Sequence, residues 1–459
     1  MTGLAPEFDP LRSAWPVWAA SDARTRRRLN VLAPFDREPL AQVDVADERH
    51  VNDALFTAFT LFRGRSRWPS ADERLAIIDG FVALIDEWAD RLAAGASHEC
   101  GQPLWMSHEE IALIREDAAT ARAALTALDG ATAAGTLVFI ADHVRPLAGP
   151  ARVLLTALAA GAPVIVAAHP NAPLSALRLV EFMERAGLRY GWAQALVIPE
   201  ADTLRALALD ARVGTLIYHG DSDQGWAWRA ALGPGTGALL LHAGSPPLIV
   251  ASDADQQLAL DVALGAGFAR AAHDRSAWRR VFVPQHDAAD FAAALGARAL
   301  ELRRGDPAEP DTDVGVHNDP GARDALRVFR DELLAGDARR APADGDGSVL
   351  FDPGTSAAAP LGRLIVVHPY DDLEAACHRA NGLPFATHAG LIGAARADVV
   401  AEWLDAPTLL VDQAALLHRW QPSAALRRSA LGPVDLAGRV RALTVARSLR
   451  GTQPAASLA

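Results

Sequence analysis

The chain has 459 residues, half of them hydrophobic and 22% charged, with a formal net charge of −12. This composition predicts a large folded core rather than disorder, and the acidic balance argues against nucleic acid as a main partner, because phosphate binding needs a basic surface. All 44 basic residues are arginine, so no lysine can form a Schiff base or an ammonium contact to a cofactor.

The cysteines and apolar stretches bear on where the protein works. Two cysteines, Cys100 and Cys377, are too few for a disulfide framework, and no basic segment followed by an apolar one opens the chain as a signal peptide would. The longest apolar stretch, ARVLLTALAAGAPVIVAA, contains Arg152, Gly161 and Pro163, whereas a membrane-spanning helix needs about 20 apolar residues. We therefore expect a soluble, cytoplasmic protein.

The N-terminal third is expected to be mainly helical. Residues 1–30 are irregular and predict a surface arm, after which a short pair of strands leads into helices. In LAIIDGFVALIDEWADRLA, apolar residues recur at the i, i+3, i+4 spacing of a helix, with Ser70 and Asp72 placed to cap it.

From Gly135 onward the pattern changes to alternating strands and helices. Strands are expected at TLVFIA, PVIVAAHP, AQALVIP, VGTLIYHG and GALLLHAG, and helices at ARVLLTALAAG, PLSALRLVEFMERAGL and TLRALALD. Strands that alternate with helices in this way predict a doubly wound parallel sheet.

Several segments resemble the aldehyde dehydrogenase superfamily. HECGQP is similar to its L-E-T-G-K-P, and ERAGLRYGWAQALVIPE to its K-E-A-G-x-P-x-G-V-x-N-V-V-x-G. LHAGSPPLIV, RRVFVP and LGRLIVVHPYDDLEAACHRANGLPFATHAGLIG also resemble family segments. The resemblance runs from about residue 30 to 450, and it implies an α/β fold with two doubly wound domains, a Rossmann-like cofactor domain and a catalytic-type domain.

The resemblance also implies the domain bounds. The NAD(P)-binding-type domain would comprise residues 1–128 and 135–240, the catalytic-type domain residues 241–425, and a C-terminal bridging segment residues 426–459. The family places an oligomerisation hairpin after an Asp-Gly turn, but here Asp129-Gly130 is followed after four residues by Gly135. Residues 129–134 are therefore expected to be a remnant of that hairpin.

The residues at the family's catalytic positions cannot perform its reaction. The nucleophilic cysteine falls at Arg275 and the general-base glutamate at Leu241, 275 − 241 = 34 residues apart, as in the family. Arginine stays protonated and does not attack, and leucine accepts no proton. The asparagine that holds the oxyanion falls at Val144, which has no side-chain donor.

Neighbouring residues offer few replacements. His273 and Ser276 could form an esterase-like pair, although such i, i+3 neighbours are also common on surfaces. His242 adjoins Leu241, but successive residues of a strand point to opposite faces, so its ring should point away. Cys100 and Cys377 are expected to be structural.

The family's cofactor contacts are also degenerate. The ribose-binding lysine falls at Ala167, and a glutamate three residues on falls at Pro170. Gly220 keeps the turn before the pyrophosphate-binding helix, but Asp221 adds an anion where a diphosphate needs backbone donors, and it could cap the helix instead. At the nicotinamide ribose, the family's glutamate and phenylalanine fall at Ala359 and Leu361.

We therefore expect a catalytically inactive pseudoenzyme with no cofactor and no metal. It would act by binding a protein partner or within a homo- or hetero-oligomer, which could include an active relative. The alternative is a divergent NAD(P)-dependent oxidoreductase that oxidises an aldehyde to a carboxylic acid. A third hypothesis has Arg270, Arg275, Arg279 and Arg280 holding an acidic ligand, although alternate ones are expected to face solvent.

Overall fold

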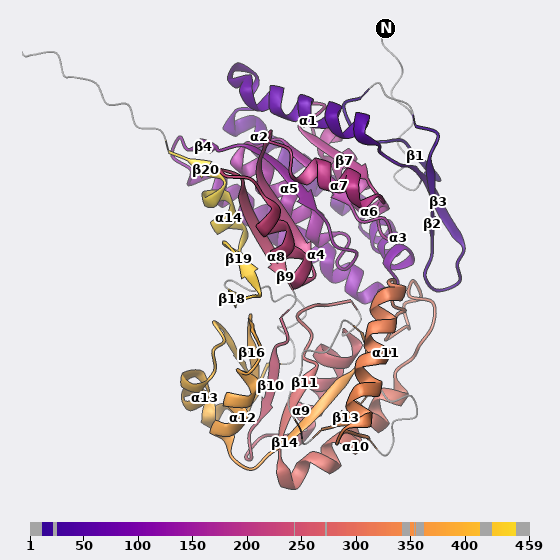
Figure 1. The fold of residues 1–459 in the computed structure, drawn as a ribbon, viewed down its shortest axis with the longest axis vertical. Helices are drawn as coiled ribbons and strands as arrows, with labels where there is room; N and C mark the ends of the chain where they lie inside the picture. The colour runs from indigo at the N-terminus through magenta and orange to yellow at the C-terminus, as the bar shows by residue number, and fades with distance from the viewer. Residues whose placement is uncertain are drawn as a thin grey trace, which may run out of the picture.

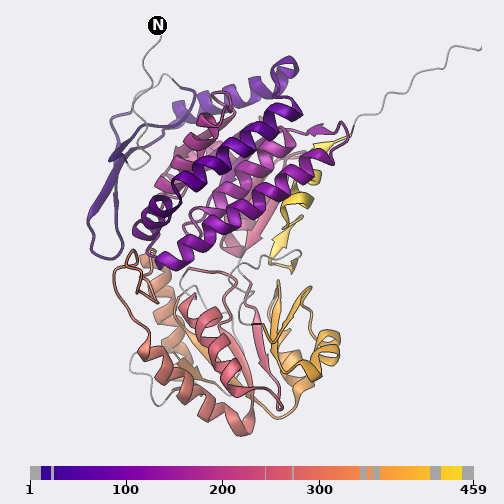
Figure 2. The ribbon, with the colours of Figure 1, turned by 180° about the vertical axis from the view of Figure 1, so that it is seen from behind.

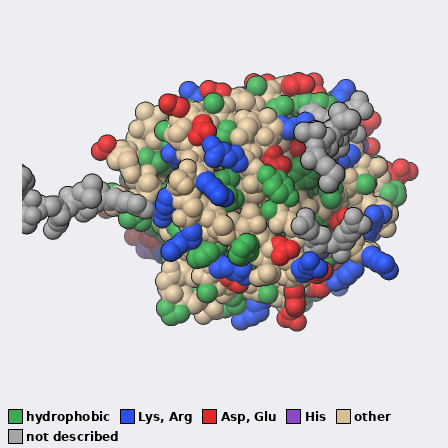
Figure 3. Space-filling view, turned by 90° about the horizontal axis from the view of Figure 1, so that it is seen from above, with side chains coloured by type: hydrophobic (Ala, Val, Ile, Leu, Met, Phe, Trp, Pro, Cys, Tyr) green, Lys and Arg blue, Asp and Glu red, His purple; other side chains and the backbone are tan. Residues whose placement is uncertain are grey.

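The computed structural model describes residues 12–21, 25–242, 244–270, 273–341, 349–352, 354, 362–413 and 425–446. Two lobes, each built around its own sheet, lie one above the other (Figure 1). Acidic and arginine side chains are interspersed over the face seen from above (Figure 3). In the described ranges, no helix is both long enough and apolar enough to span a membrane.

The upper lobe contains a six-stranded sheet in the order β19-β9-β8-β5-β6-β7. All neighbours are parallel except the short β19, which runs antiparallel to β9. The expected doubly wound parallel sheet is therefore present. Its strands are β5 (Thr136–Ile140), β6 (Val164–Ala168), β7 (Ala193–Val197), β8 (Val213–Gly220), β9 (Gly237–His242) and β19 (Ala430–Leu431).

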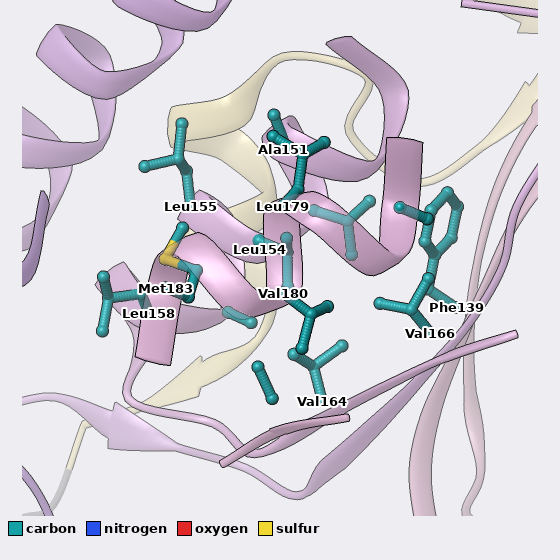
Figure 4. Packing of buried hydrophobic residues seen from close by; sticks show 14 of the residues in the cluster. Phe139, Ala151, Leu154, Leu155, Leu158, Val164, Val166, Leu179, Val180 and Met183 are labelled. Atoms are coloured by element: carbon teal, nitrogen blue, oxygen red, sulfur yellow. The ribbon is translucent and has the colours of Figure 1, made fainter. Parts of the chain in front are cut away.

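Helices cover both faces of this sheet, and each face has its own apolar core because side chains alternate along a strand. One core contains Phe139 and Val166 with helices such as α5 and α6, and Figure 4 shows their leucines and valines packed together. The other contains Val138, Ile165 and Tyr218. The helices of this lobe are α1 (Glu48–Arg63), η1 (Arg65–Arg67), α2 (Ala71–Glu87), α3 (Ala89–Cys100), α4 (Leu104–Thr126), α5 (Ala148–Ala160), α6 (Leu174–Arg185), α7 (Ala201–Ala208), α8 (Ser222–Ala231) and α14 (Leu436–Ala442).

The start of α2 is where the sequence predicts it. The Ser70 side chain accepts from the Glu73 amide, and the Glu73 carboxylate accepts from the Ser70 amide, which is a capping box. Asp72 is not the cap but lies in the first helical turn, where a negative charge is favourable.

The lower lobe contains a seven-stranded sheet in the order β12-β13-β14-β11-β10-β16-β17, parallel except for β12. Its strands are β10 (Pro247–Val250), β11 (Arg280–Pro284), β12 (Arg339–Arg340), β13 (Val349–Phe351), β14 (Ile365–Tyr370), β16 (Ala389–Ile392) and β17 (Leu409–Val411). Its helices are α9 (Gln256–Val262), the π-helix η2 (Ala263–Ala269), α10 (Gln285–Glu301), α11 (Pro320–Ala335), α12 (Leu373–Ala380), η3 (Ala394–Arg396) and α13 (Ala397–Trp403).

The C-terminal segment forms two short strand pairs, the first of them with the upper lobe. The C-terminal segment returns there, as its yellow ribbon shows (Figures 1 and 2), and β20 (Thr444–Val445) pairs antiparallel with β4 (Thr132–Ala133). β4 lies within residues 129–134, where the resemblance leads us to expect a hairpin remnant. A second short pair joins β15 (Phe385–Ala386) to β18 (Leu426–Arg427).

The described part of the N-terminal segment is not the irregular arm expected from the sequence. Trp15 is 1% exposed, and β1 (Ala14–Trp15) pairs in parallel with β3 (Pro39–Asp44), which also pairs with β2 (Arg28–Leu32). Burial of the indole therefore anchors this segment.

Candidate functional site

Two adjoining cavities lie at the carboxyl ends of the upper sheet. Cavity A has a volume of about 100 Å³, and its lining includes Val144, Gly149, His219, Leu241, Arg275 and Val434. Cavity B has a volume of about 480 Å³, and its lining includes His169, Leu204, Arg205, Tyr218, Gln224 and Trp228. Both are lined by Asp142, His219, Gly220 and Arg275, so these residues stand where the two cavities meet.

The register of β8 and β9 brings four residues beside the cavities. His219 is opposite Leu241, and Gly220 is opposite His242. All four line cavity A, and His219 and Gly220 line cavity B as well. The His242 ring also packs towards α8. A Cβ on Gly225 of α8 would lie 1.9 Å from Cε1 of His242, so this approach requires glycine. His242 thus borders cavity A, contrary to the expectation that its ring points away, and burial lowers its pKa to about 4.

An ion pair holds Arg275, the residue that the resemblance aligns with the family's nucleophile. Arg275 lies between η2 and β11, and Asp142 follows β5. The Arg275 Nε donates to Oδ2 of Asp142 at 2.5 Å, and Nη2 donates to Oδ1 at 3.1 Å. Burial alone would raise the pKa of Asp142, but the charge of Arg275 and hydrogen bonds from His143 and Arg275 hold it well below its usual value. Asp142 is therefore ionised and Arg275 is held by two bonds.

A second pair crosses the first. The Arg145 Nη2 donates to Oδ2 of Asp274 at 2.6 Å, so residues 142 and 145 on one loop bind residues 275 and 274 on the other. Oδ1 of Asp274 also accepts from both the amide and the hydroxyl of Ser276, each at 2.8 Å. The Ser276 hydroxyl is thus bound to a carboxylate rather than to His273, and the esterase-like pair is not formed.

The expectation that alternate arginines of the third hypothesis face solvent is wrong. Arg270, Arg279 and Arg280 are 3%, 2% and 1% exposed. Arg270 pairs with Glu109 of α4. Arg280 donates to backbone carbonyls, including that of Ser245 at 3.1 Å. These side chains are buried because the two lobes and the turns of the lower lobe close over this segment.

Two buried glutamates hold the loops that lead into cavities A and B. Oε2 of Glu110 accepts from the amides of Leu147 and Ala148 at the start of α5, at 3.0 and 2.7 Å. Glu99 accepts from the amide and the hydroxyl of Ser175 in α6, at 3.0 and 2.6 Å. Burial raises the pKa of both carboxyls. Each glutamate satisfies helix N-terminal donors that have no partner within the helix.

Two of the expected cofactor positions, Gly220 and Asp221, line cavity B. Ala167 lies near the end of β6 and is 3% exposed, and Pro170 is in the turn before α6. Gly220 ends β8 with a φ of 153°. Asp221 caps α8 by accepting from the amides of Asp223 and Gln224, at 2.8 and 3.1 Å. Ala359 and Leu361 lie outside the described residues.

Cavity B fits a nucleotide in place and size, although its contacts differ from those expected of the family. Its volume is within the usual range for small-molecule pockets, and parallel α/β sheets bind ligands at the carboxyl ends of their strands. Asp221 occupies the first amides of α8, so Arg205 of α7, His169 after β6 and Gln224 would supply polar contacts instead. Burial lowers the pKa of His169 to about 4, so its ring is neutral.

Among the described residues, neither cavity is lined by a cysteine, and no cluster could hold a metal ion. Cys100 ends α3 and Cys377 lies in α12, both buried. Burial raises the pKa of Cys100 well above its usual value and that of Cys377 to about 11. Neither thiol is therefore placed or activated for attack.

Sequence reasoning missed Asp142 and His219. The segments D-H-V-R at 142–145 and D-R at 274–275 carry complementary charges, and this pattern could have indicated the crossed pairs. No local pattern identifies His219, whose role depends on Arg439, 220 residues away.

Comparisons with known proteins identify relatives of this fold. A model described as the aldehyde dehydrogenase family matches residues 18–349. The chain is 27% identical over 412 residues to N-succinylglutamate 5-semialdehyde dehydrogenase of Chromohalobacter salexigens, covering 83% of each chain. It is 28% identical over 356 residues to non-phosphorylating aspartate-semialdehyde dehydrogenase of Halomonas elongata, covering 71% of this chain and 70% of the relative.

Solved structures agree on the fold. Betaine aldehyde dehydrogenase of Staphylococcus aureus in complex with NAD+ has a TM-score of 0.86 at 19% identity, covering 94% of this chain and 93% of that one. The expected two-domain α/β fold is therefore confirmed.

Two expectations change with these comparisons. The expectation of no cofactor is contradicted, because structures that match this chain are complexes with NAD+, including an aldehyde dehydrogenase of Bacillus cereus. The relatives are named as semialdehyde dehydrogenases, which favours the alternative reading, an aldehyde-oxidising oxidoreductase, over an inactive protein.

Proposed function

Because the chain belongs to the aldehyde dehydrogenase family, we propose that it is a nicotinamide-dependent oxidoreductase that converts an aldehyde to a carboxylic acid. The observation that carries the proposal is the pair of adjoining cavities at the carboxyl ends of the upper sheet. Cavity B has the size and position for the dinucleotide, and cavity A has room for a short aldehyde. The names of the relatives support the same reaction class.

The dinucleotide would be held by Arg205, His169 and Gln224 of cavity B. A nicotinamide bound there supplies the hydride acceptor. The residues of this chain then have to bind the aldehyde, polarise its carbonyl group and exclude unwanted water.

The reaction cannot pass through a thioester formed at the position of Arg275, because arginine is not a nucleophile there. A path without a covalent intermediate starts from the hydrated aldehyde, RCH(OH)2. The C–H bond breaks, its electron pair leaves as hydride to the acceptor, and one hydroxyl releases its proton. The product is the acid RCOOH, which ionises in water, so atoms and electrons balance.

Two hydrogen-bond donors of cavity A suit the aldehyde oxygen. The Arg439 Nη1 is 3.2 Å from Nε2 of His219. Because arginine only donates, Nε2 accepts and the neutral ring carries its proton on Nδ1. That N–H and the Nη1 group of Arg275 can donate to the oxygen and make the carbon more susceptible to water. Val144 and Leu241 form an apolar wall for the alkyl chain.

One observation favours a second candidate, an inactive protein that acts through binding. The Arg275–Asp142 pair lines both cavities, so it lies between the aldehyde and the hydride acceptor. Unless the pair moves, hydride transfer is obstructed. Such a protein would work with a protein partner or a second subunit.

Purified protein separates the two candidates. Binding of NAD+ and NADP+ would be followed by quenching of tryptophan fluorescence, and turnover with succinate and aspartate semialdehydes by absorbance of the reduced nicotinamide. The oxidoreductase proposal expects binding and aldehyde-dependent reduction that a heat-denatured sample lacks. Binding without reduction for any aldehyde would favour the second candidate.

A further inference from the structure

The ion pair with Asp142 uses only two of the three nitrogen groups of the Arg275 side chain. Its Nε and Nη2 bind Asp142, and within the described part of the chain no hydrogen bond involves its Nη1. The side chain lines cavity A and is 20% exposed. Arg275 lines cavity B as well, and because Asp142 fixes the guanidinium plane, Nη1 can donate to a ligand at the place where the two cavities meet at little further cost in side-chain entropy.

His219 provides a second donor whose direction is fixed. Arg439 binds its Nε2, and the Phe139 ring packs edge-on against the imidazole, with centroids 4.9 Å apart. Burial and the charge of Arg439 hold the pKa of His219 well below its usual value, so the ring stays neutral. Nδ1 lies 3.9 Å from where a Cβ on Gly149 would be, and Gly149 itself lines cavity A. The Nδ1–H therefore faces the cavity.

The charge that favours an anion near cavity A comes from one arginine that does not line it. The three arginines in the lining are each bound to an aspartate, Arg145 to Asp274, Arg152 to Asp117 and Arg275 to Asp142, so these pairs are neutral together. The arginine outside the lining, Arg279, is 2% exposed, and among the described residues its Nε and Nη1 have no hydrogen-bond partner. Burial and, after it, the charge of Arg275 lower the pKa of Arg279 to about 10, so the two guanidinium groups repel each other.

Two departures from the family pattern have the same electrostatic effect. Leu241 stands at the family's general-base position, where a glutamate would repel an anion, and Arg275 stands at the nucleophile position, where it attracts one. The remaining walls include Val144 and Val434. The cavity thus combines two convergent donors with a short apolar wall.

We propose that cavity A is a binding site for a short-chain carboxylate, whose oxygens accept hydrogen bonds from Nη1 of Arg275 and Nδ1 of His219. The site is the one assigned above to the aldehyde, so the inference rests on that proposal and adds that the acid form is bound tightly. A volume of about 100 Å³ limits the ligand to a few heavy atoms beyond the carboxylate.

Butyrate and its neutral isostere butyramide are the probes, measured by calorimetry on the full chain without dinucleotide. We expect butyrate to bind and butyramide to bind at least about tenfold more weakly, since hydrogen bonds to charged groups are the stronger ones. Equal affinities, or no binding of butyrate, would overturn the proposal.

Matched variants test the residues. Leu241→Glu should weaken butyrate binding at least about tenfold, whereas the equal-sized Leu241→Gln should change it by less than about threefold. The neutral pair Arg275→Gln with Asp142→Asn, which leaves no buried charge unpaired, should also lose at least about tenfold, with exposed Arg229→Gln as its control. Equal effects of the two Leu241 variants, or unchanged binding in the double variant, contradict the assignment.

The experiment is separable from the test of the proposed function, because it requires neither dinucleotide nor turnover. Butyrate binding without aldehyde oxidation would sustain the carboxylate site and remove the proposed reaction. Oxidation without selective carboxylate binding would do the reverse.

Discussion

Arg275 and Asp142, which are 133 residues apart, form a two-bond ion pair between the lobes, with N–O distances of 2.5 and 3.1 Å. The Arg145–Asp274 pair crosses it at 2.6 Å. Each loop therefore carries one aspartate and one arginine, and each of these side chains binds the oppositely charged side chain on the other loop. The residue that the resemblance aligns with the family's nucleophile is therefore part of a contact between the two lobes.

Removing one partner of this pair should destabilise the protein strongly. Arg275→Leu leaves the Asp142 carboxylate, 7% exposed, without its counter-charge. Because an uncompensated buried charge is costly, we expect the free energy of unfolding to fall by about 3–5 kcal/mol in urea titrations. The double variant Arg275→Leu with Asp142→Leu should recover most of this loss.

The matched control is Arg122→Leu, whose partner Asp79 is on the surface. Exposed pairs contribute about 0–1 kcal/mol, so this variant should remain close to wild type. If this variant lost as much free energy of unfolding as Arg275→Leu, the buried pair between the lobes would contribute no more to stability than a surface pair.

Buried neutral histidines should make stability fall on mild acidification. Burial lowers the pKa of His169 and His242 to about 4 and that of His368 and His388 to about 3. The unfolded chain, with a histidine pKa of about 6.5, binds protons first. The contribution of these histidines to the free energy of unfolding is therefore complete above about pH 6.5. It declines towards pH 4 by about 1.4 kcal/mol per pH unit for each such histidine.

Urea titrations across this range measure the slope. His368→Phe should reduce it by about one histidine's share, and the exposed His286→Gln should leave it unchanged. The histidine pKa values set the range from about pH 6.5 to about pH 4. If the free energy of unfolding did not change across this range, the prediction that these buried rings are neutral would be contradicted.

The buried carboxylate of Glu110 should contribute to the placement of the loop before α5. Glu110→Ala removes the acceptor of the Leu147 and Ala148 amides, and we expect a loss of about 1–3 kcal/mol in thermal or urea unfolding. Glu110→Gln, which keeps a carbonyl oxygen, should lose less. The exposed Glu87→Ala is the control, and equal losses at the two sites would refute a specific role for this cap.

The two thiols should resist alkylation in the folded protein. Cys100 is 1% exposed and Cys377 is fully buried, with raised pKa values. We expect iodoacetamide to label neither one at neutral pH and both in denaturant, as counted by mass spectrometry, while an Arg229→Cys variant labels rapidly. Rapid native labelling of Cys100 or Cys377 would reopen a thiol mechanism.

Local patterns predicted the elements well, and tertiary pairing much less. VGTLIYHG was expected to be a strand, and β8 spans those residues, because a buried parallel strand needs a continuous apolar run. Asp221 caps α8 as a helix N-terminus favours. Burial of Trp15 and Arg270 depends on partners far along the chain, Val43 of β3 and Glu109, and no local periodicity indicates such partners.

The candidate site was predictable as a position but not as a geometry. The resemblance assigns Arg275 and Leu241 to one site, and both residues line cavity A. That Asp142 orients Arg275 and that Arg439 orients His219 could not be inferred, because each depends on where two distant segments meet. Substituted catalytic positions alone also suggested that no cofactor is used, which the NAD+ complexes of matching structures contradict.

The most direct test of aldehyde oxidation without a thiol is the rate of NAD(P)+ reduction by a variant that carries Cys100→Ser and Cys377→Ser, compared with wild type, with succinate semialdehyde as substrate. Wild type and variant should form the reduced nicotinamide at the same rate, because neither sulfur lies at cavity A or B. Loss of activity in the variant alone, or absence of aldehyde-dependent reduction in both, would contradict this account.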